Sequence, residues 1–311
     1  MNGPSGKTIK RSRFGIFTKT NLTLYAMFLP AIVYYIIFCY IPMAGIAIAF
    51  ADFRPSGFVK WVGFDNFQYL FNLPFFWRAL VNTFQFVFLD YLIDFPFPII
   101  LALLLNEVRV KLFKKTVQTI TVLPHFLSWV VVSGIFIAML SPSTGFVNAA
   151  IKAMGGSPVY FLAKPEWFQM LVTLIRTWKG AGYSAIIYLA AISGIDQELY
   201  EAAVTDGAGR WKQAIHITLP GIRMVIVICL VLSFAGVLNL FDPVFVFSGD
   251  NALLTTTGEV LDTYIYKNGV VRAKYSVSTA AGLFKSVVSL GFMLTVNYVS
   301  KKLSDDNKSV I

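Results

Sequence analysis

The sequence predicts an all-α polytopic membrane protein with six transmembrane helices. Three observations predict this fold class: an apolar composition, six long apolar segments and an uneven distribution of Lys and Arg along the chain. Of the 311 residues, 57% are hydrophobic and 14% are charged, and the mean hydropathy is +0.68. Soluble domains carry about 25% charged residues, so most of this chain is expected to lie in lipid.

Six apolar segments are each longer than the roughly 18 residues that mark a transmembrane helix. They are Leu22–Phe50, Ala79–Leu105, Val117–Leu140, Trp167–Ile192, Met224–Phe247 and Val277–Val299. The first is too long for the apolar core of a secretory signal, about 7–15 residues, and is expected to be retained. The predicted organisation is a tail over 1–21, a six-helix domain over 22–300 that contains a polar loop over 194–222, and a tail over 301–311.

The basic residues define the orientation. Fifteen Lys and Arg fall on one side of the predicted membrane and eight on the other. Because cytoplasmic loops are enriched in these residues, both termini and the loop between spans four and five are predicted to be cytoplasmic. This asymmetry accounts for the formal net charge of +10, so no nucleic-acid partner is expected.

Several kinds of chemistry are not indicated by the sequence. Cys39 and Cys229 lie in apolar spans, where a thiol behaves as a small hydrophobe, and His125 and His216 are too far apart to suggest a metal site. The segment over 3–8 resembles part of a phosphate-binding loop, but its first glycine is too close to the Gly-Lys-Thr triplet. No catalytic residue, metal site or ATPase is therefore predicted in this chain.

The polar loop between spans four and five is predicted to form two short helices. Asp196 is a suitable N-cap for a helix that begins at Gln197. Gly207 is expected to end that helix, because glycine adopts left-handed dihedral angles at little cost. A second helix is predicted from about Arg210 to Thr218.

This loop resembles the cytoplasmic signature of binding-protein-dependent ABC importer permeases. That signature reads Glu-Ala-Ala, three residues, Gly, nine residues, Ile, one residue, Leu-Pro. All seven fixed positions are matched, by Glu201, Ala202, Ala203, Gly207, Ile217, Leu219 and Pro220. These seven residues and Asp206 are the predicted ATPase-coupling residues. Four further segments look like carbohydrate-type permeases, in particular the branch that imports complex oligosaccharides such as plant and algal polysaccharide fragments: Trp61–Phe67, Leu103–Glu107, Leu123–Trp129 and Gly258–Tyr266.

The resemblance implies a type I ABC importer permease fold in a bacterial cytoplasmic membrane. It also implies a second permease subunit, expected to be a different chain, two ATPase subunits that hold ATP and Mg²⁺, and an extracytoplasmic solute-binding protein. Residues 201–207 would lie in a cleft of an ATPase subunit and transmit its closure to the spans. The binding protein would dock on outer loops that include Phe53–Trp77 and Ser248–Tyr275.

Ionisable residues within the spans are candidates for the substrate path, because such groups usually face a protein interior or a water-filled cavity. They are Asp90, Asp94, Arg176, Lys179, Asp242 and Lys285. The two carboxylates at i,i+4 share a helix face, as do the two cations at i,i+3, so opposite charges could pair across the bundle. Arg176 is predicted to contact substrate. Lys179 lies at a position that looks typical of the family, and this resemblance implies a structural or gating role. Asp242 and Lys285 lie nearer span ends, where snorkelling or internal pairing is expected.

Aromatic and amide side chains on spans four and five complete the predicted path. Trp178, Tyr183, Tyr188 and Phe241 could stack on sugar rings, and Asn239 could bind hydroxyl groups. The alternative for each aromatic residue is ordinary packing or a place at the membrane interface.

The predicted cargo is an oligosaccharide, and the two intramembrane cations together with the family branch motivate the hypothesis of an acidic, uronate-containing one. Three alternatives remain at this stage. The first is an ABC permease for another small solute. The second is a secondary transporter driven by an ion gradient, although the chain shows no repeated halves. The third is an intramembrane enzyme, for which no catalytic set of residues is found.

Overall fold

The computed structural model describes residues 19–249, 251, 254 and 256–303. The basic residues Lys7, Lys10, Arg11 and Arg13, the segment over 3–8 and Lys308 lie outside the described residues, as do parts of the predicted outer loop over 248–275. The chain forms two units, residues 1–47 and residues 48–311.

The first unit is a single apolar helical run. Its elements are α1 (Lys19–Tyr35), a π-helical segment (Ile36–Tyr40), α2 (Ile41–Met43) and a 3-10 segment (Ala44–Phe50) that extends into the second unit. The run over Asn21–Phe50 has the length and composition of a membrane span, in agreement with the first predicted span.

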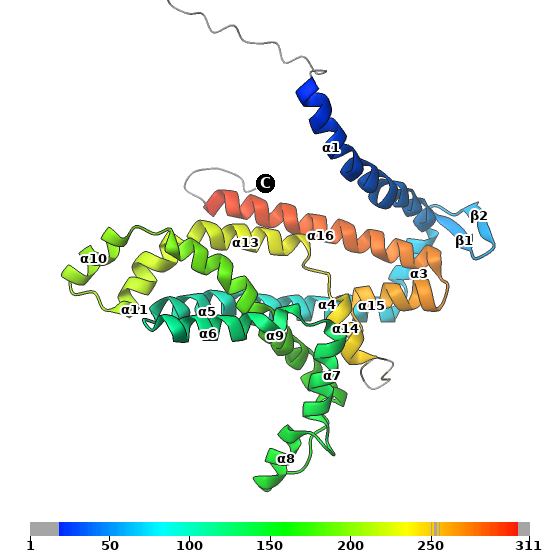
Figure 1. The fold of residues 1–311 in the computed structure, drawn as a ribbon. Helices are drawn as coiled ribbons and strands as arrows, with labels where there is room; N and C mark the ends of the chain where they lie inside the picture. The colour runs from blue at the N-terminus through cyan, green and yellow to red at the C-terminus, as the bar shows by residue number, and fades with distance from the viewer. Residues whose placement is uncertain (1–18, 250, 252–253, 255, 304–311) are drawn as a thin grey trace, which may run out of the picture. The chain divides into compact units, whose positions relative to one another are not determined.

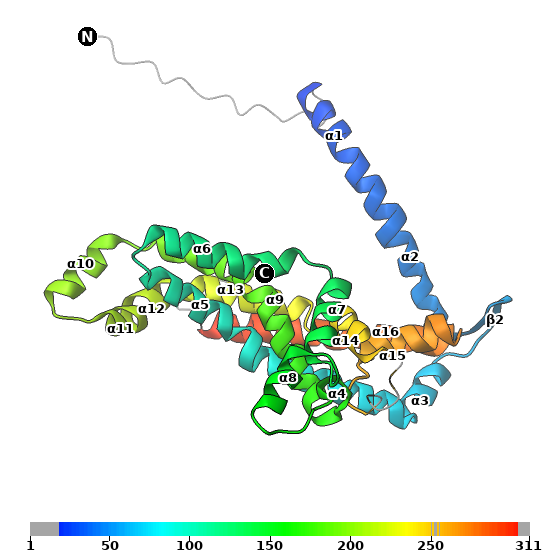
Figure 2. The same ribbon diagram turned by 60° about the horizontal axis from the view of Figure 1, so that its bottom comes forward.

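The second unit is a helical bundle (Figure 1). Its α-helices are α3 (Asp65–Phe71), α4 (Pro74–Leu89), α5 (Pro96–Glu107), α6 (Lys111–Val122), α7 (Trp129–Leu140), α8 (Phe146–Ala153), α9 (Pro165–Ser193), α10 (Gln197–Thr205), α11 (Arg210–Gln213), α12 (Leu219–Gly221), α13 (Arg223–Ala235), α14 (Phe241–Ser248), α15 (Leu261–Tyr266) and α16 (Tyr275–Leu303). Shorter π-helical or 3-10 segments are Asp90–Asp94, Leu123–Phe126, Phe161–Ala163, Ala214–Thr218 and Lys267–Val271. In two views α10 and α11 lie at one end of this unit and α3 lies at the other (Figure 1, Figure 2).

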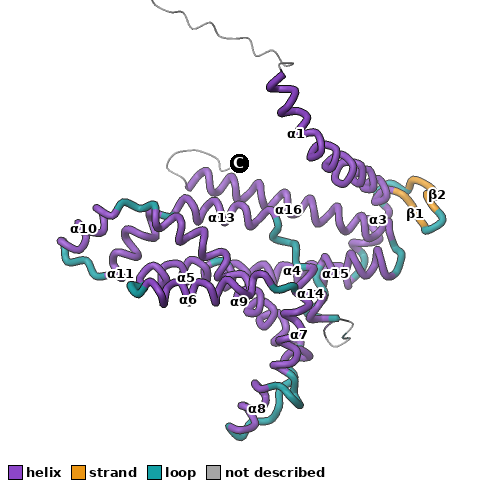
Figure 3. The backbone as a smooth tube through the Cα atoms, in the orientation of Figure 1, coloured by secondary structure: helices purple, strands orange, loops and turns teal. Residues whose placement is uncertain are grey.

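The prediction that the fold is entirely helical missed a β-hairpin. Strands β1 (Ala51–Arg54) and β2 (Gly57–Trp61) pair antiparallel, and the hairpin is the orange segment in Figure 3. The turn depends on Gly57, whose φ of 118° is accessible to glycine at low cost. Asn66 fixes the base of the hairpin by donating hydrogen bonds to the carbonyls of Ala49 and Ala51, at 2.9 and 3.0 Å.

Six spans are not confirmed. Within the part of the chain that the structure describes, three helical runs are long and apolar enough to cross a membrane: Asn21–Phe50, Pro74–Glu107 and Tyr275–Tyr298. Two bent helix pairs would raise that number to five if each pair is one span. The fourth predicted span forms the continuous 29-residue helix α9, but polar residues such as Arg176 and Lys179 lower its hydropathy.

Predicted spans three and five are interrupted, which the apolar pattern alone did not indicate. The helical segments on either side of Leu127 and Ser128 meet at 106°. The segment over Met224–Phe247 divides into α13 and α14, with a non-helical connection between Ala235 and Phe241. Hydrophobicity identifies a segment that prefers lipid or a protein interior, but it does not specify that the segment is one straight helix.

The core is organised around α9. One buried cluster joins Phe168, Val172 and Ile175 of α9 to Val132 of α7 and Val244 of α14. A second cluster joins Ala185, Tyr188 and Ile192 of α9 to Ala102 of α5 and Ile222 at the start of α13. Helix α9 therefore contacts both interrupted segments and the second predicted span. A third cluster joins α3, α4, α15 and α16.

We expect Gly182→Ala to destabilise the bundle, because the backbone of α6 lies directly against α9 at this residue. A Cβ atom at position 182 would lie 2.1 Å from the carbonyl oxygen of Thr121, and this neighbour is backbone that cannot rotate away. Overpacking of this kind costs about 1–3 kcal/mol. Thermal unfolding of the purified permease measures the effect. Gly180→Ala on the same helix is the matched control, because its Cβ would meet nothing within 4 Å. Equal melting temperatures for both variants would contradict the close approach.

Candidate functional site

The polar loop forms the two predicted short helices. The Asp196 side chain caps α10 by accepting a hydrogen bond from the Glu198 N–H at 3.0 Å. At the other end, Gly207 has a φ of 74°. The Gly207 and Ala208 N–H groups donate to the carbonyls of Val204 and Ala203, at 3.0 and 2.8 Å, and form a Schellman motif. The predicted N-cap and the predicted glycine stop are both confirmed.

The two arms of the loop are tied together by side chains that the sequence did not single out. The Tyr200 hydroxyl on α10 hydrogen-bonds the Thr218 hydroxyl of the second arm at 2.9 Å, and Thr218 is buried. Arg210, the first residue of α11, forms an ion pair at 3.6 Å with Glu107, the last residue of α5. The loop is thus linked to itself and to the end of the second predicted span.

The loop presents its signature residues outward. Glu201, Ala202, Asp206, Gly207, Leu219 and Pro220 are exposed, and Ala203 and Ile217 are half-buried. Three exposed apolar side chains accompany them, Leu199, Val204 and Trp211, and Trp211 is 77% exposed. Exposed apolar patches rimmed by polar residues mark sites of contact with a protein or a membrane, and these three side chains are candidates for such contact. Trp211, an aromatic residue in an otherwise polar loop, is the sequence signal that could have indicated this contact surface.

A cavity of about 450 Å³ lies among the second predicted span, α9 and α13. This volume is within the range of about 300–1,000 Å³ that is typical of ligand sites. Four of the predicted path residues line it: Asp90, Asp94, Arg176 and Tyr188. Tyr91 and Ser233, which the sequence did not suggest, also line it and hydrogen-bond one another at 2.9 Å.

The charge of Arg176 is already paired in this cavity. Its Nη1 atom lies 2.6 and 2.5 Å from the two carboxylate oxygens of Asp90, and the two side chains are only 20% and 15% exposed. Pairing across the bundle, predicted for these opposite charges, is confirmed for this pair. Asp94 lies one turn further along and also lines the cavity, so carboxylates outnumber cations there.

Lys179 and Tyr183 lie at the bend between α6 and α7 rather than in the cavity. The Lys179 ammonium group donates to the His125 carbonyl at 2.9 Å and lies 5.2 Å from the centre of the Trp129 ring. Tyr183 stacks on the His125 ring with 4.0 Å between centroids. His125 and Trp129 belong to the Leu123–Trp129 segment, so this part of the resemblance corresponds to a bend in the chain.

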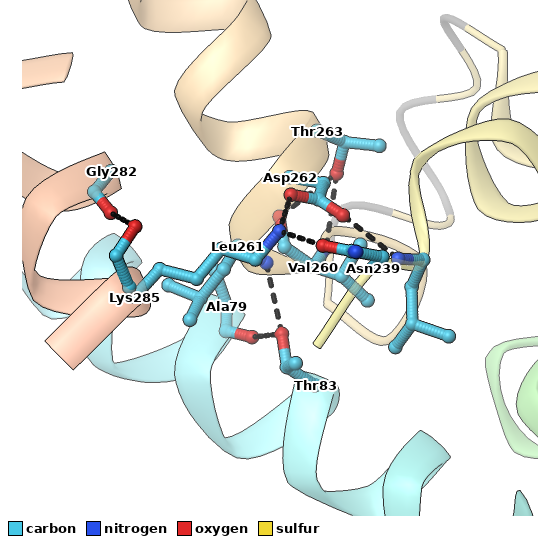
Figure 4. Close-up of polar contacts among 11 residues, drawn as sticks. Ala79, Thr83, Asn239, Val260, Leu261, Asp262, Thr263, Gly282 and Lys285 are labelled. Atoms are coloured by element: carbon cyan, nitrogen blue, oxygen red, sulfur yellow. Dashed lines mark hydrogen bonds and ion pairs between the residues drawn. The ribbon is translucent and has the colours of Figure 1, made fainter. Parts of the chain in front are cut away.

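Asn239 and Lys285 line a second polar pocket of about 500 Å³, and Figure 4 shows the polar contacts between them and Asp262. The Lys285 ammonium group forms an ion pair with Asp262 and donates to the Asn239 side-chain oxygen at 2.8 Å. The other Asp262 oxygen accepts a hydrogen bond from the Leu240 N–H at 2.8 Å. Lys285 is only 14% exposed, so it pairs internally and does not snorkel. Asp262 was missed because it lies outside the predicted spans.

The remaining candidates make packing contacts. Trp178 meets Phe136 of α7 edge to face at 5.3 Å, and Phe241 stacks on Phe245 at 4.9 Å. Asp242 is exposed in the first turn of α14. The structure therefore distributes the nine predicted path residues over several places instead of one continuous path.

The Gly258–Tyr266 segment, which includes α15, is hydrogen-bonded to α4. Asn82 of α4 donates to the carbonyls of Thr256 and Glu259, at 2.9 Å each, and Thr83 accepts from the Leu261 N–H at 2.9 Å. Burial raises the pKa of the half-buried Glu259 carboxyl, while the nearby cations Lys267, Arg272 and Arg78 oppose that rise. These hydrogen bonds fasten the residues before and at the start of α15 to α4.

Known proteins resemble this chain over almost its whole length. "Protein LplB" of Bacillus subtilis (strain 168) is 42% identical over 292 residues, which are 93% of this chain and 91% of the relative. "Polygalacturonan/rhamnogalacturonan transport system permease protein YteP" of the same organism is 44% identical over 304 residues, 96% and 94% of the two chains. A solved chain of a bacterial ABC transporter involved in the import of the acidic polysaccharide alginate matches with a TM-score of 0.86 and 42% identity, over 92% of this chain and 98% of that one.

Similarity of this extent to transport-system permeases, over almost the whole chain, shows that the protein is a transport permease by class. The chain belongs to the family of binding-protein-dependent transport system inner membrane components, whose model matches residues 41–305. The resemblance seen in the loop is confirmed, and the type I permease fold with it. An ion-gradient-driven transporter is not favoured.

Proposed function

We propose that this chain is the permease subunit of an ATP-driven importer of oligosaccharides, and that the preferred cargo is acidic. The observation that carries the proposal is identity above 40%, over more than nine-tenths of both chains, to a permease named for polygalacturonan and rhamnogalacturonan and to a chain of an alginate importer. Both names specify acidic polysaccharides. Other relatives are named for neutral sugars but are less similar, such as a lactose permease of Rhizobium radiobacter at 32% identity.

The cavity supports a polar cargo but does not by itself favour an anion. Arg176 is paired with Asp90, and Asp94 adds a further carboxylate. Lys179 is engaged by a backbone carbonyl outside the cavity. The acidic part of the proposal therefore rests on the relatives and no longer on these two cations.

In the proposed assembly, a second permease, two ATPase subunits and an extracytoplasmic binding protein complete the importer, and the ATPase subunits hold ATP and Mg²⁺. One solved relative is a complex with an alginate-pentasaccharide-bound periplasmic protein, which supports the last of these partners. The loop over 194–222 and both tails are proposed to be cytoplasmic. The exposed Glu201–Gly207 stretch would dock on an ATPase subunit, and closure of the ATPase pair would open the cavity outward.

Cargo preference can be measured as substrate-stimulated ATPase activity of the assembled complex in lipid nanodiscs with its binding protein. We expect galacturonate or alginate oligomers to stimulate hydrolysis several-fold more than neutral oligosaccharides of the same length. Measurements at two salt concentrations separate specific binding from screening. Equal stimulation by acidic and neutral oligomers would remove the acidic part of the proposal, and no stimulation by any oligosaccharide would remove the cargo class.

A further inference from the structure

Within the part of the chain that the structure describes, three cationic side chains lie in the middle of long helices: Arg176 and Lys179 on α9, and Lys285 on α16. Both helices are uninterrupted over 29 residues. Each of the three cations contacts a neighbouring helical run at a place where its regular α-helical geometry is interrupted. These three interruptions are the π-helical segment Asp90–Asp94 inside the continuous run Pro74–Glu107, the bend between α6 and α7, and the non-helical connection between α13 and α14. The proposed cargo path does not explain why all three cations lie beside an interruption.

Arg176 contacts the interruption between α4 and α5. The segment Asp90–Asp94 is π-helical, and the Phe95 N–H donates to the Asp90 carbonyl at 2.8 Å. The residue that follows is Pro96, which has no N–H to donate. Arg176 pairs with the carboxylate of Asp90, the first residue of the π-helical segment.

Lys179 contacts the interruption between α6 and α7. The 3-10 turn Leu123–Phe126 ends at Leu127, where the chain turns by 106°. Carbonyl groups at such an end have lost their helical partners. The His125 carbonyl obtains one from the Lys179 ammonium group, at 2.9 Å.

Lys285 contacts the interruption between α13 and α14. The Leu240 N–H precedes α14 and is bound by Asp262, while the Asn239 side chain is bound by Lys285. Lys285 also supplies the counter-charge of Asp262. Figure 4 shows the Lys285 side chain reaching from α16 to both partners.

Backbone groups freed by a break at membrane depth must be satisfied by the protein, because lipid offers no hydrogen bonds. Ionisable side chains at that depth need partners for the same reason. We propose that Arg176, Lys179 and Lys285 are positioning residues that hold the three interruptions in place, and that they do not contact cargo. Helix α9 carries two of them one turn apart, so the interruptions in predicted spans two and three are held by one helix.

The assignment connects the interruptions to the exposed loop. Helix α9 ends at Ser193, and α10 begins at Gln197. A displacement of the loop would therefore move a helix that holds both α4–α5 and α6–α7 by charged contacts. The inference rests on the proposed transport function only for this consequence and for the activity measurement below.

The distance across the α6–α7 bend tests the role of Lys179 directly. Spin labels are attached at Ile120→Cys and Ile137→Cys, both exposed, in a background in which Cys39 and Cys229 are alanine. Double electron–electron resonance in nanodiscs measures the distance between the two labels. We expect one narrow distance distribution for the parent protein and for Lys179→Arg, which keeps the hydrogen-bond donor. Lys179→Met is expected to broaden or shift it. Lys164→Met, an exposed cation just before α9, is the matched control and should resemble the parent.

Transport measurements separate positioning from cargo contact. We expect Lys179→Met to lower the uptake of acidic and neutral oligosaccharides by the same factor, with rescue by Lys179→Arg. An unchanged distance distribution in Lys179→Met, or a loss confined to acidic cargo, overturns the proposal. If the parent complex transports no oligosaccharide, the proposed function fails, whereas the distance measurement still decides the role of Lys179.

Lys285 provides an independent test if Lys179→Met does not fold. Labels at Leu232→Cys and Asp242→Cys, both exposed, report the break between α13 and α14. Lys285→Met should broaden this distribution and Lys285→Arg should preserve it. An identical distribution in all three proteins overturns the proposal for this interruption.

Discussion

Replacing Gly207 with proline is expected to reduce transport by more than tenfold while basal ATPase activity and membrane insertion persist. The φ of 74° at Gly207 is not accessible to proline, whose ring holds φ near −65°. The substitution also removes the N–H that donates to the Val204 carbonyl. The turn that directs α11 away from α10 would be lost, although the predicted spans are untouched.

Two substitutions serve as controls for this result. Gly209→Pro makes the same chemical change two residues away, where φ is −68° and proline fits. Gly207→Asn retains the N–H, and asparagine tolerates left-handed dihedral angles. Both are expected to transport at near-parent rates. Parallel measurements of uptake and ATP hydrolysis in proteoliposomes check the result, and normal uptake by Gly207→Pro would mean that this loop is not the coupling element.

The second large effect is expected at the ion pair between Arg176 and Asp90. Removal of one partner of a buried pair leaves an uncompensated charge and costs about 3–5 kcal/mol. Because these side chains remain 20% and 15% exposed, we expect a loss near the lower end, about 3 kcal/mol, for Arg176→Gln. Thermal unfolding of the purified permease measures it.

The double variant Arg176→Gln with Asp90→Asn should recover most of the lost stability, because neither site then holds an unpaired charge. A double-mutant cycle gives the coupling between the two side chains. Arg176→Gln with Asp94→Asn is the matched control, since Asp94 lines the same cavity without forming the pair. Equal recovery by both double variants would show that the cavity responds to net charge and not to the specific pair.

Several features of this protein were determined by local sequence. Composition and apolar segment length identified a membrane protein, because transfer of apolar side chains from water is favourable wherever they lie in the fold. The loop was predictable in detail, since Asp196 as N-cap and Gly207 in a left-handed conformation act through their own backbone neighbours. Its seven matched signature positions also identified the family correctly.

Only the tertiary structure decided how the spans are interrupted and which charges meet. Hydrophobicity treats Val117–Leu140 as one segment, yet the segment bends, and the His125 carbonyl at the bend accepts a hydrogen bond from Lys179, more than fifty residues later in the chain. Asp262 lies outside any apolar segment and pairs with Lys285 across the fold. A pairing of this kind depends on distances between helices, and these are set by close contacts such as Gly182 against the Thr121 backbone, which no local pattern in the sequence encodes.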